Sequence, residues 1–164
     1  MKQVNKRREL FNSIFSMFNP NKVENEIIAR PPYFKNMDDL FDNCLDCNGE
    51  CVNSCPENII KIGKDNLPFL DFKSGGCTYC DECVKGCSKK ILKLEYKSNI
   101  KVSFQINEAN CLSHNQTICF SCKESCPSNA INFKGLFKAQ IKNDLCTNCG
   151  FCFGVCPSNA IYKV

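Results

Sequence analysis

The chain has 164 residues, the length of one ordinary domain or two very small ones, and 16 of them are cysteines. This cysteine content is far above ordinary usage, and the other apolar residues leave little aliphatic surface for a conventional core. The sequence contains no Trp and a single His, which disfavours Cys2His2 zinc sites, His-based acid–base catalysis and Ser-His-Asp hydrolysis. We therefore expect the cysteines to hold the fold together and to carry the function.

The N-terminus contains a twin-arginine pair, Arg7 and Arg8, of the kind found in export signals. Polar residues interrupt the stretch that follows, and no small-residue cleavage site comes after it, so we expect the segment to stay uncleaved. No apolar run is long enough to predict a membrane span. We therefore expect a cytoplasmic protein whose thiols stay reduced for metals or redox chemistry.

Residues 1–35 are expected to form an amphipathic N-terminal segment. Its apolar residues recur at largely helical spacing: Leu10, Phe11, Ile14, Phe15, Met17 and Phe18. Two interpretations stay open, because such a helix can pack on the protein's own surface or dock in a groove of a partner. The docking interpretation predicts that removing residues 1–19 abolishes partner capture without loss of iron.

Four cysteine runs repeat along the rest of the chain. They are Cys44, Cys47, Cys51 and Cys55; Cys77, Cys80, Cys83 and Cys87; Cys111, Cys119, Cys122 and Cys126; and Cys146, Cys149, Cys152 and Cys156. Apolar segments with partial alternation precede three runs, at residues 67–72, 102–106 and 137–141, and an apolar pair follows each run. The repeating unit is therefore predicted to be a strand, a cysteine loop and a short helix.

The spacing of the cysteines favours iron–sulfur clusters over zinc. The second and fourth runs have the spacing C-x2-C-x2-C-x3-C, and Pro56, Pro127 and Pro157 follow the last cysteine of the first, third and fourth runs, as in bacterial ferredoxins. Zinc sites usually join two C-x2-C pairs across a longer loop, and a disulfide framework needs an oxidising compartment. We therefore predict up to four 4Fe-4S clusters with all sixteen cysteines as ligands.

In two-cluster ferredoxins the fourth cysteine of a run ligates the other cluster. This crossed arrangement would join Cys44, Cys47 and Cys51 with Cys87; Cys77, Cys80 and Cys83 with Cys55; Cys111, Cys119 and Cys122 with Cys156; and Cys146, Cys149 and Cys152 with Cys126. The alternative is that each run closes on its own cluster. The predicted fold is α+β, with two tandem bacterial-ferredoxin-like modules of short strands and helices at residues 36–98 and 99–164.

Two runs depart from the regular spacing. The first has one extra residue between Cys47 and Cys51, which Gly49 must accommodate in a bulge. The third has seven residues between Cys111 and Cys119, and we expect His114 in this excursion to be a solvent-exposed loop residue.

Charge and the remaining motifs exclude other functions. The formal charge is +4, but sixteen thiolates around four oxidised cores would add about −8 and leave about −4. Lys and Arg are also dispersed, so we predict no nucleic-acid partner. The sequence has no phosphate-binding Gly-rich motif and no acid–base or nucleophile constellation, so we expect no enzymatic activity.

The chain resembles the NapF family, the ferredoxin-type proteins of the periplasmic nitrate reductase system. The resemblance covers nearly the whole chain and is carried by the Arg7 and Arg8 pair, the RPPYF segment at residues 30–34, the four runs and the C-x7-C spacing of the third. The extra residue in the first run departs from the family pattern. The resemblance implies a cytoplasmic accessory protein that acts on the catalytic nitrate reductase subunit before export, in maturation or cluster assembly. The alternative is an electron carrier, or an electron-transfer subunit between redox partners.

Overall fold

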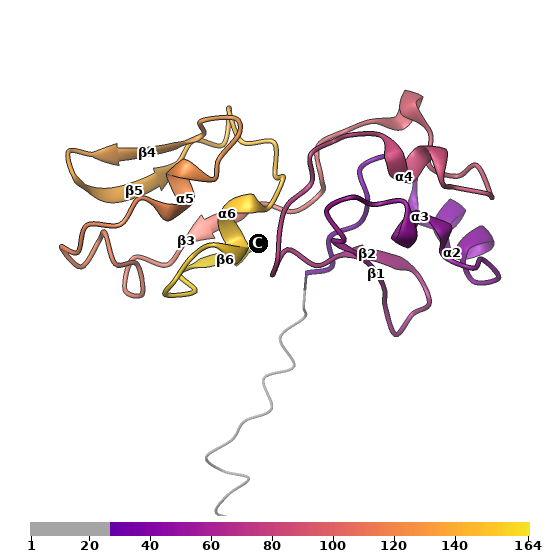
Figure 1. Ribbon diagram of the computed structural model, residues 1–164, viewed down its shortest axis with the longest axis horizontal. Helices are drawn as coiled ribbons and strands as arrows, with labels where there is room; N and C mark the ends of the chain where they lie inside the picture. Colours follow the sequence, from indigo (N-terminus) through magenta and orange to yellow (C-terminus); the bar gives the residue numbers. More distant parts are fainter. Residues whose placement is uncertain (1–26) are drawn as a thin grey trace, which may run out of the picture.

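The computed structural model describes residues 27–164, so the helix predicted in the N-terminal segment lies outside the described residues. The described chain consists of short helices and short antiparallel strand pairs, which confirms the predicted α+β class. Two lobes lie side by side in Figure 1, one from each half of the chain. Within this range, no helix has the length and the apolar character that a membrane span requires.

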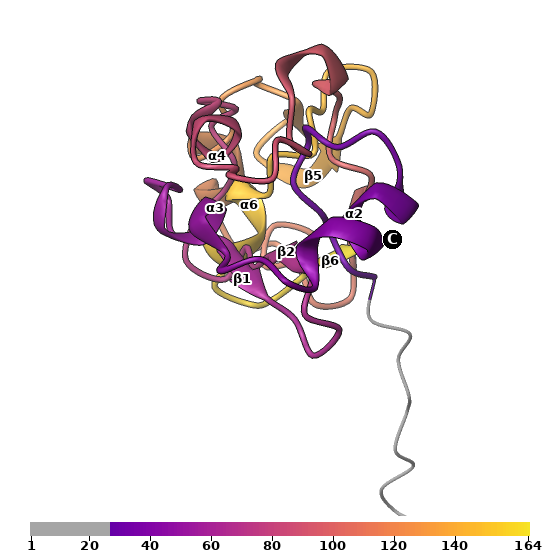
Figure 2. The same ribbon diagram turned by 90° about the vertical axis from the view of Figure 1, so that its right-hand side faces the viewer.

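The first half contains the helices α2 (Met37–Cys44), α3 (Glu50–Asn53) and α4 (Glu82–Lys85), the 3-10 turn η1 (Leu94–Tyr96), and the strands β1 (Ile60–Ile62) and β2 (Pro68–Leu70). The two strands pair antiparallel, with Ile60 opposite Leu70. Helix α2 begins after Asn36, whose side chain accepts a hydrogen bond from the backbone N–H of Asp39. It lies at the end of the molecule that faces away from the second half (Figures 1 and 2).

The second half contains the helices α5 (Ser121–Glu124) and α6 (Phe151–Gly154) and the strands β3 (Phe104–Ile106), β4 (Ile131–Lys134), β5 (Phe137–Ile141) and β6 (Ile161–Lys163). β4 and β5 form a hairpin, whereas β3 pairs with β6 at the far end of the sequence. The alternation in residues 102–106 and 137–141 therefore correctly predicts strands.

The predicted order of strand, cysteine loop and short helix is wrong in one respect. A single helical turn lies inside each run and carries its third cysteine, and in three runs a strand follows. The turn ends before the fourth cysteine, and a residue with positive φ three positions after that cysteine redirects the chain. These residues are Asn58, Lys90, Asn129 and Asn159. The apolar pair after each run therefore enters a new segment instead of continuing a helix.

Residues 29–34 pack into the core of the first half, although the domain prediction assigns them to the N-terminal segment. The carbonyl oxygen of Ala29 accepts a hydrogen bond from the backbone N–H of Leu70 at 2.8 Å, and that of Tyr33 accepts one from Lys93 at 2.8 Å. Tyr33 is fully buried, and its hydroxyl donates to Asp81 at 2.6 Å. The segment precedes the first run, the one run for which the sequence predicts no leading strand.

The two halves share one hydrophobic core. The ring of Phe72 meets that of Phe104 edge to face, with centroids 5.5 Å apart, and Phe104 also contacts Phe153. Phe72 belongs to the first half and the other two rings to the second. Burial of these rings away from water holds the two halves against each other.

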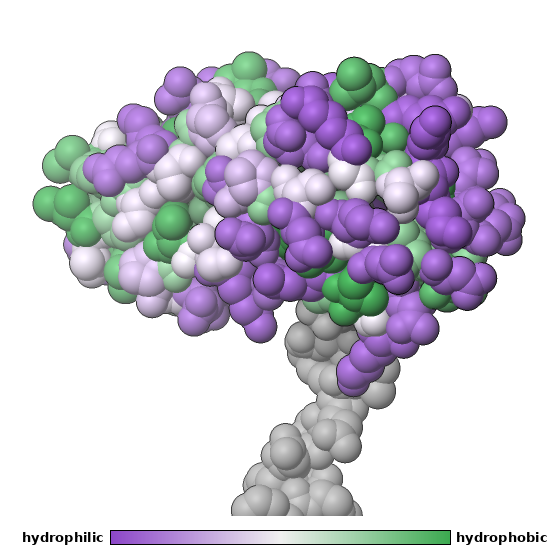
Figure 3. Space-filling model, turned by 45° about the vertical axis from the view of Figure 1, so that its right-hand side comes forward, coloured by the Kyte–Doolittle hydropathy of each residue, from purple (hydrophilic) through white to green (hydrophobic). Residues whose placement is uncertain are grey.

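The surface in Figure 3 is mostly hydrophilic over the first half, and hydrophobic residues gather at the far end of the second.

Candidate iron–sulfur centres

The structure groups the sixteen thiols across the runs. Cys44, Cys47 and Cys51 line a small cavity together with Cys87, and we name these four thiols set A. Cys77, Cys80 and Cys83 line a second small cavity together with Cys55, and these form set B. In both cavities, three cysteines of one run meet the fourth cysteine of the other run. The grouping is therefore the crossed one.

The second half repeats this arrangement. Cys111, Cys119 and Cys122 line a small cavity together with Cys156, and these four thiols form set D. Set C consists of Cys126, Cys146, Cys149 and Cys152. After burial, the nearby thiols of Cys126 and Cys149 contribute to a raised pKa at both Cys146 and Cys152. Sets A, B and D each place three cysteines of one run and the fourth cysteine of another run around one small cavity, as expected if they take the same kind of group.

A one-turn helix carries the third cysteine of each run, and in three of the four runs that cysteine is buried. Cys51, Cys83 and Cys152 lie on α3, α4 and α6 and are buried. Three of these turns start directly after a residue with positive φ, which is Gly49, Asp81 or Gly150. Gly49 has φ +72°, a conformation that glycine adopts without strain, and this lets the first run absorb its extra residue.

Ionising these thiols is unfavourable unless a cation is bound. Burial, followed by the neighbouring Cys87, Cys47 and Cys44, raises the pKa of Cys51 to about 12. Burial and the thiols of its own set also raise the pKa of Cys122 to about 11. Four thiolates packed together repel one another, so their deprotonated form requires bound positive charge such as iron.

The spacing of the thiols suits a polynuclear cluster. In residues 27–164, no group of three or more His, Cys, Asp or Glu is placed to hold a metal ion. In sets A, B and D four sulfur atoms surround one cavity, which suits a cubane with one iron per thiolate.

Each set receives a hydrogen bond from the backbone to one of its sulfur atoms. The donors are the N–H groups of Gly49 to Cys47 at 3.5 Å, Tyr79 to Cys77 at 3.4 Å, Ala130 to Cys126 at 3.3 Å and Ala160 to Cys156 at 3.2 Å. Burial alone would raise the pKa of Cys156, but the N–H groups of Ala160 and Ser158 lower it below the ordinary value of a thiol. Such bonds stabilise thiolates bound to iron and tune the reduction potential.

The four sets form a row in the order A, B, C, D. Cys51 of set A lies near enough to Cys83 of set B to raise its pKa, and Cys122 of set D has the same effect on Cys152 of set C. Sets B and C meet across the junction of the two halves, where the backbone N–H of Cys77 donates to the carbonyl oxygen of Cys149 at 2.7 Å.

Tyr79 reinforces this junction. Its hydroxyl donates to the carbonyl oxygen of Thr147 at 2.5 Å and accepts from the backbone N–H of Ile100 at 3.2 Å. The side-chain amide of Asn148 donates to the carbonyl oxygen of Ile100 at 3.1 Å. Nothing in the cysteine spacing indicates these partners, because they meet only when the halves pack together.

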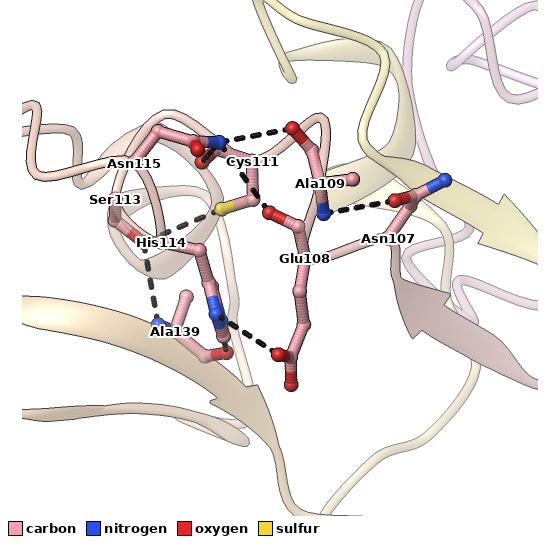
Figure 4. Close-up of polar contacts among 8 residues, drawn as sticks. All are labelled: Asn107, Glu108, Ala109, Cys111, Ser113, His114, Asn115 and Ala139. Atoms are coloured by element: carbon pink, nitrogen blue, oxygen red, sulfur yellow. Dashed lines mark hydrogen bonds and ion pairs between the residues drawn. The ribbon is translucent and has the colours of Figure 1, made fainter.

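The excursion in the third run is ordered against β5. The expectation that His114 is solvent-exposed is wrong, because its side chain is only 9% exposed and Nε2 lies 2.9 Å from the carbonyl oxygen of Ala139. Nδ1 of the same ring lies 3.6 Å from the carboxylate of Glu108 (Figure 4). His114 therefore holds the loop beside Cys111 against β5. It does not line the cavity of set D.

Comparisons with known proteins agree with this chemistry. A family model described as a 4Fe-4S dicluster domain matches residues 117–160, and one described as a 4Fe-4S binding domain matches residues 44–59. The chain is similar to the ferredoxin-type protein NapF of Escherichia coli K12, with 30% identity over 80% of this chain and 82% of the relative. It is 32% identical to NapF of Haemophilus influenzae, over 91% of this chain and 86% of the relative.

A more distant likeness joins the chain to one subunit of an ion-translocating oxidoreductase complex from Methanosarcina acetivorans, with 29% identity over 69% of this chain and 44% of that protein. The matched domains and the sixteen cysteines establish multiple 4Fe-4S clusters, and the relatives establish an iron–sulfur electron-transfer protein. With this identity to relatives that it covers over most of their length, the chain belongs to the NapF family of ferredoxin-type proteins.

Proposed function

We propose that each of sets A to D holds one 4Fe-4S cluster through its four cysteines, and that residues 36–98 and 99–164 are two tandem bacterial-ferredoxin-like modules. Support comes from the crossed grouping of the thiols, since each cavity needs a cysteine from both runs of its half. When bound, such clusters accept and donate single electrons. The chain's own residues hold the thiolates, exclude water with buried rings and place N–H donors at the sulfur atoms.

We further propose that the protein is a cytoplasmic accessory factor of periplasmic nitrate reductase that acts on the catalytic subunit before its export. The observation that carries this proposal is the row of four thiol sets, which continues from one half into the other through the contact of Cys77 with Cys149. Such a row can deliver electrons to a partner whose own centres are being assembled. Membership of the NapF family names the system in which that partner belongs.

A plain electron carrier is the second candidate. It is favoured by the likeness to a subunit of an ion-translocating oxidoreductase complex, because an oxidoreductase moves electrons between redox partners without assembling them. In either case the chain acts through electron transfer, so we propose no catalytic residues of its own.

The two candidates differ in the form of the partner that is bound. The full-length, cluster-loaded chain is mixed anaerobically with the catalytic nitrate reductase subunit in two forms, the unexported precursor without its metal centres and the mature enzyme. An accessory factor binds the precursor more tightly and increases the fraction that becomes active. Equal binding with rapid electron transfer to the mature enzyme would instead support the carrier, and binding to neither form would exclude this subunit as the partner.

A further inference from the structure

Hydroxyl side chains contact the cysteine sulfur atoms unevenly. In residues 27–164 four such contacts occur, all in the second half: Ser113 with Cys111 at 3.3 Å, Ser121 with Cys119 at 3.8 Å, Ser158 with Cys156 at 3.8 Å and Ser128 with Cys126 at 3.6 Å. Three of them fall on set D and one on set C. In the part of the chain that the structure describes, sets A and B have none.

The contact of Ser113 has a defined direction. Ser113 is completely buried, and its Oγ accepts a hydrogen bond from the backbone N–H of Ala139 at 3.3 Å. When Cys111 binds iron as a thiolate it carries no proton, so the proton between the two residues must come from the hydroxyl of Ser113. Figure 4 shows Ser113 between Cys111 and Ala139, held in a loop that His114 fastens to the same strand. The hydroxyl is thus positioned as a donor to the sulfur.

Backbone donors do not distinguish the sets in this way, because every set has at least one N–H bond to sulfur at 3.2 to 3.5 Å. The hydroxyl contacts therefore add to a background that the four sets share. A donor to a thiolate stabilises the reduced form more than the oxidised form, since reduction increases the negative charge on sulfur.

The opposite end of the row has the opposite electrostatics. The thiol of Cys47 in set A donates a hydrogen bond to a carboxylate oxygen of Glu50 at 3.3 Å, and the same oxygen accepts one from Ser88. When Cys47 binds iron as a thiolate it has no proton to donate, so this carboxylate then places negative charge beside the sulfur. Such a charge disfavours reduction of the group that set A holds.

We propose that Ser113, with Ser121 and Ser158, gives set D the highest reduction potential in the chain, and that Glu50 lowers the potential at set A. This inference rests on the proposed function, because it needs a 4Fe-4S cluster in each set. The reduction potential would then rise along the row from set A to set D, and we call this gradient the polarity of the row. In a stepwise reduction, set D takes the first electron and set A the last.

The test is a potentiometric titration of the full-length loaded protein with dithionite, followed by electron paramagnetic resonance. Ser113→Ala should lower the highest-potential step and leave the others in place. The ratio of reduced to oxidised centre at a fixed potential should fall about tenfold, which is about 59 mV for one electron. Ser121→Ala and Ser158→Ala should lower the same step by less, and Glu50→Gln should raise the lowest step.

Ser125→Ala is the matched control, because the hydroxyl of Ser125 donates to the carbonyl oxygen of Cys122 at 3.1 Å and contacts no sulfur. Its titration should match that of the wild type. Unchanged iron with an unshifted highest step in all three variants of set D would overturn the polarity and leave the proposed clusters intact. Absence of iron and sulfide from the wild type would instead overturn the proposed function itself. If Ser113→Ala fails to fold, the half-buried Ser121 and Ser158 decide the question.

Discussion

Gly76 lies so close to Phe151 that a Cβ atom on the glycine would be 2.6 Å from the backbone nitrogen of the phenylalanine. Gly76 belongs to the first half and precedes Cys77, whereas Phe151 begins α6 in the second half. The close approach lets the backbone N–H of Cys77 reach the carbonyl oxygen of Cys149. The junction between sets B and C thus depends on a position without a side chain.

Gly76→Ala should therefore push the halves apart. Overpacking of this kind costs about 1 to 3 kcal/mol, and the lost contact at Cys77 should slow electron exchange between the halves. Thermal unfolding of the loaded protein and freeze-quench reduction kinetics would measure the two effects. Gly75→Ala is the control, because its Cβ would meet Ile59 and Glu57 at ordinary distances of 3.6 to 3.8 Å. Equal behaviour of the two variants would show that the junction tolerates a side chain.

The crossed grouping predicts an asymmetry between paired cysteine variants. Cys47→Ala combined with Cys87→Ala removes two ligands of set A, so the loaded protein should lose about one cluster. Cys80→Ala combined with Cys87→Ala removes one ligand from set B and one from set A, so two clusters should be impaired. Iron and sulfide analysis after anaerobic reconstitution distinguishes the variants. The reverse order of losses would mean that each run closes on its own cluster.

Cofactor load tests the assignment of all four sets. The reconstituted chain should contain about four iron and four sulfide per set, with a broad visible absorption that bleaches on reduction. Burial raises the pKa of buried ligands such as Cys83 to about 12, so binding should release protons as the thiols ionise. Stoichiometric zinc without sulfide would contradict the assignment.

Local sequence signals predicted the parts of the structure that depend on short-range pattern. The four runs and the strands at residues 102–106 and 137–141 follow from spacing and alternation. Asn at three of the four positive-φ positions after the runs is another local signal, because Asn tolerates this conformation well.

Contacts between distant segments could not be predicted in this way. Residues 29–34 contain no strand pattern, and they enter the core through contacts with distant residues, among them the backbone donors of Leu70 and Lys93. Ser113 and His114 resemble ordinary loop residues until β5 is placed beside them. Tertiary packing therefore decides which residues surround the sulfur atoms, although spacing decides where the sulfur atoms lie.

The ion pair between Arg30 and Asp65 should stabilise the first half with a specific pH dependence. Arg30 is nearly buried and also donates to the carbonyl oxygen of Pro68 at 3.0 Å. A hydrogen bond from Arg30 is the largest influence that lowers the pKa of Asp65 below its ordinary value of 3.8. A carboxyl with a lowered pKa in the folded state stabilises the fold above its unfolded pKa and loses this effect as the pH falls through the folded pKa.

Asp65→Asn should therefore cost about 1 to 2 kcal/mol, because it leaves a nearly buried guanidinium without its counter-charge at a partly exposed site. The difference from wild type should be the same at about pH 7 and about pH 5, since both lie above the titration of this carboxyl. Denaturant midpoints of the two loaded proteins, measured anaerobically at both pH values, would give this difference in stability. Asp71→Asn is the matched control, because Asp71 and Asp65 each accept a backbone N–H two residues ahead, at 3.1 Å, and Asn can keep that bond. A loss for Asp65→Asn no larger than that of the control, or a difference that already shrinks between these pH values, would refute the stabilising role of the pair.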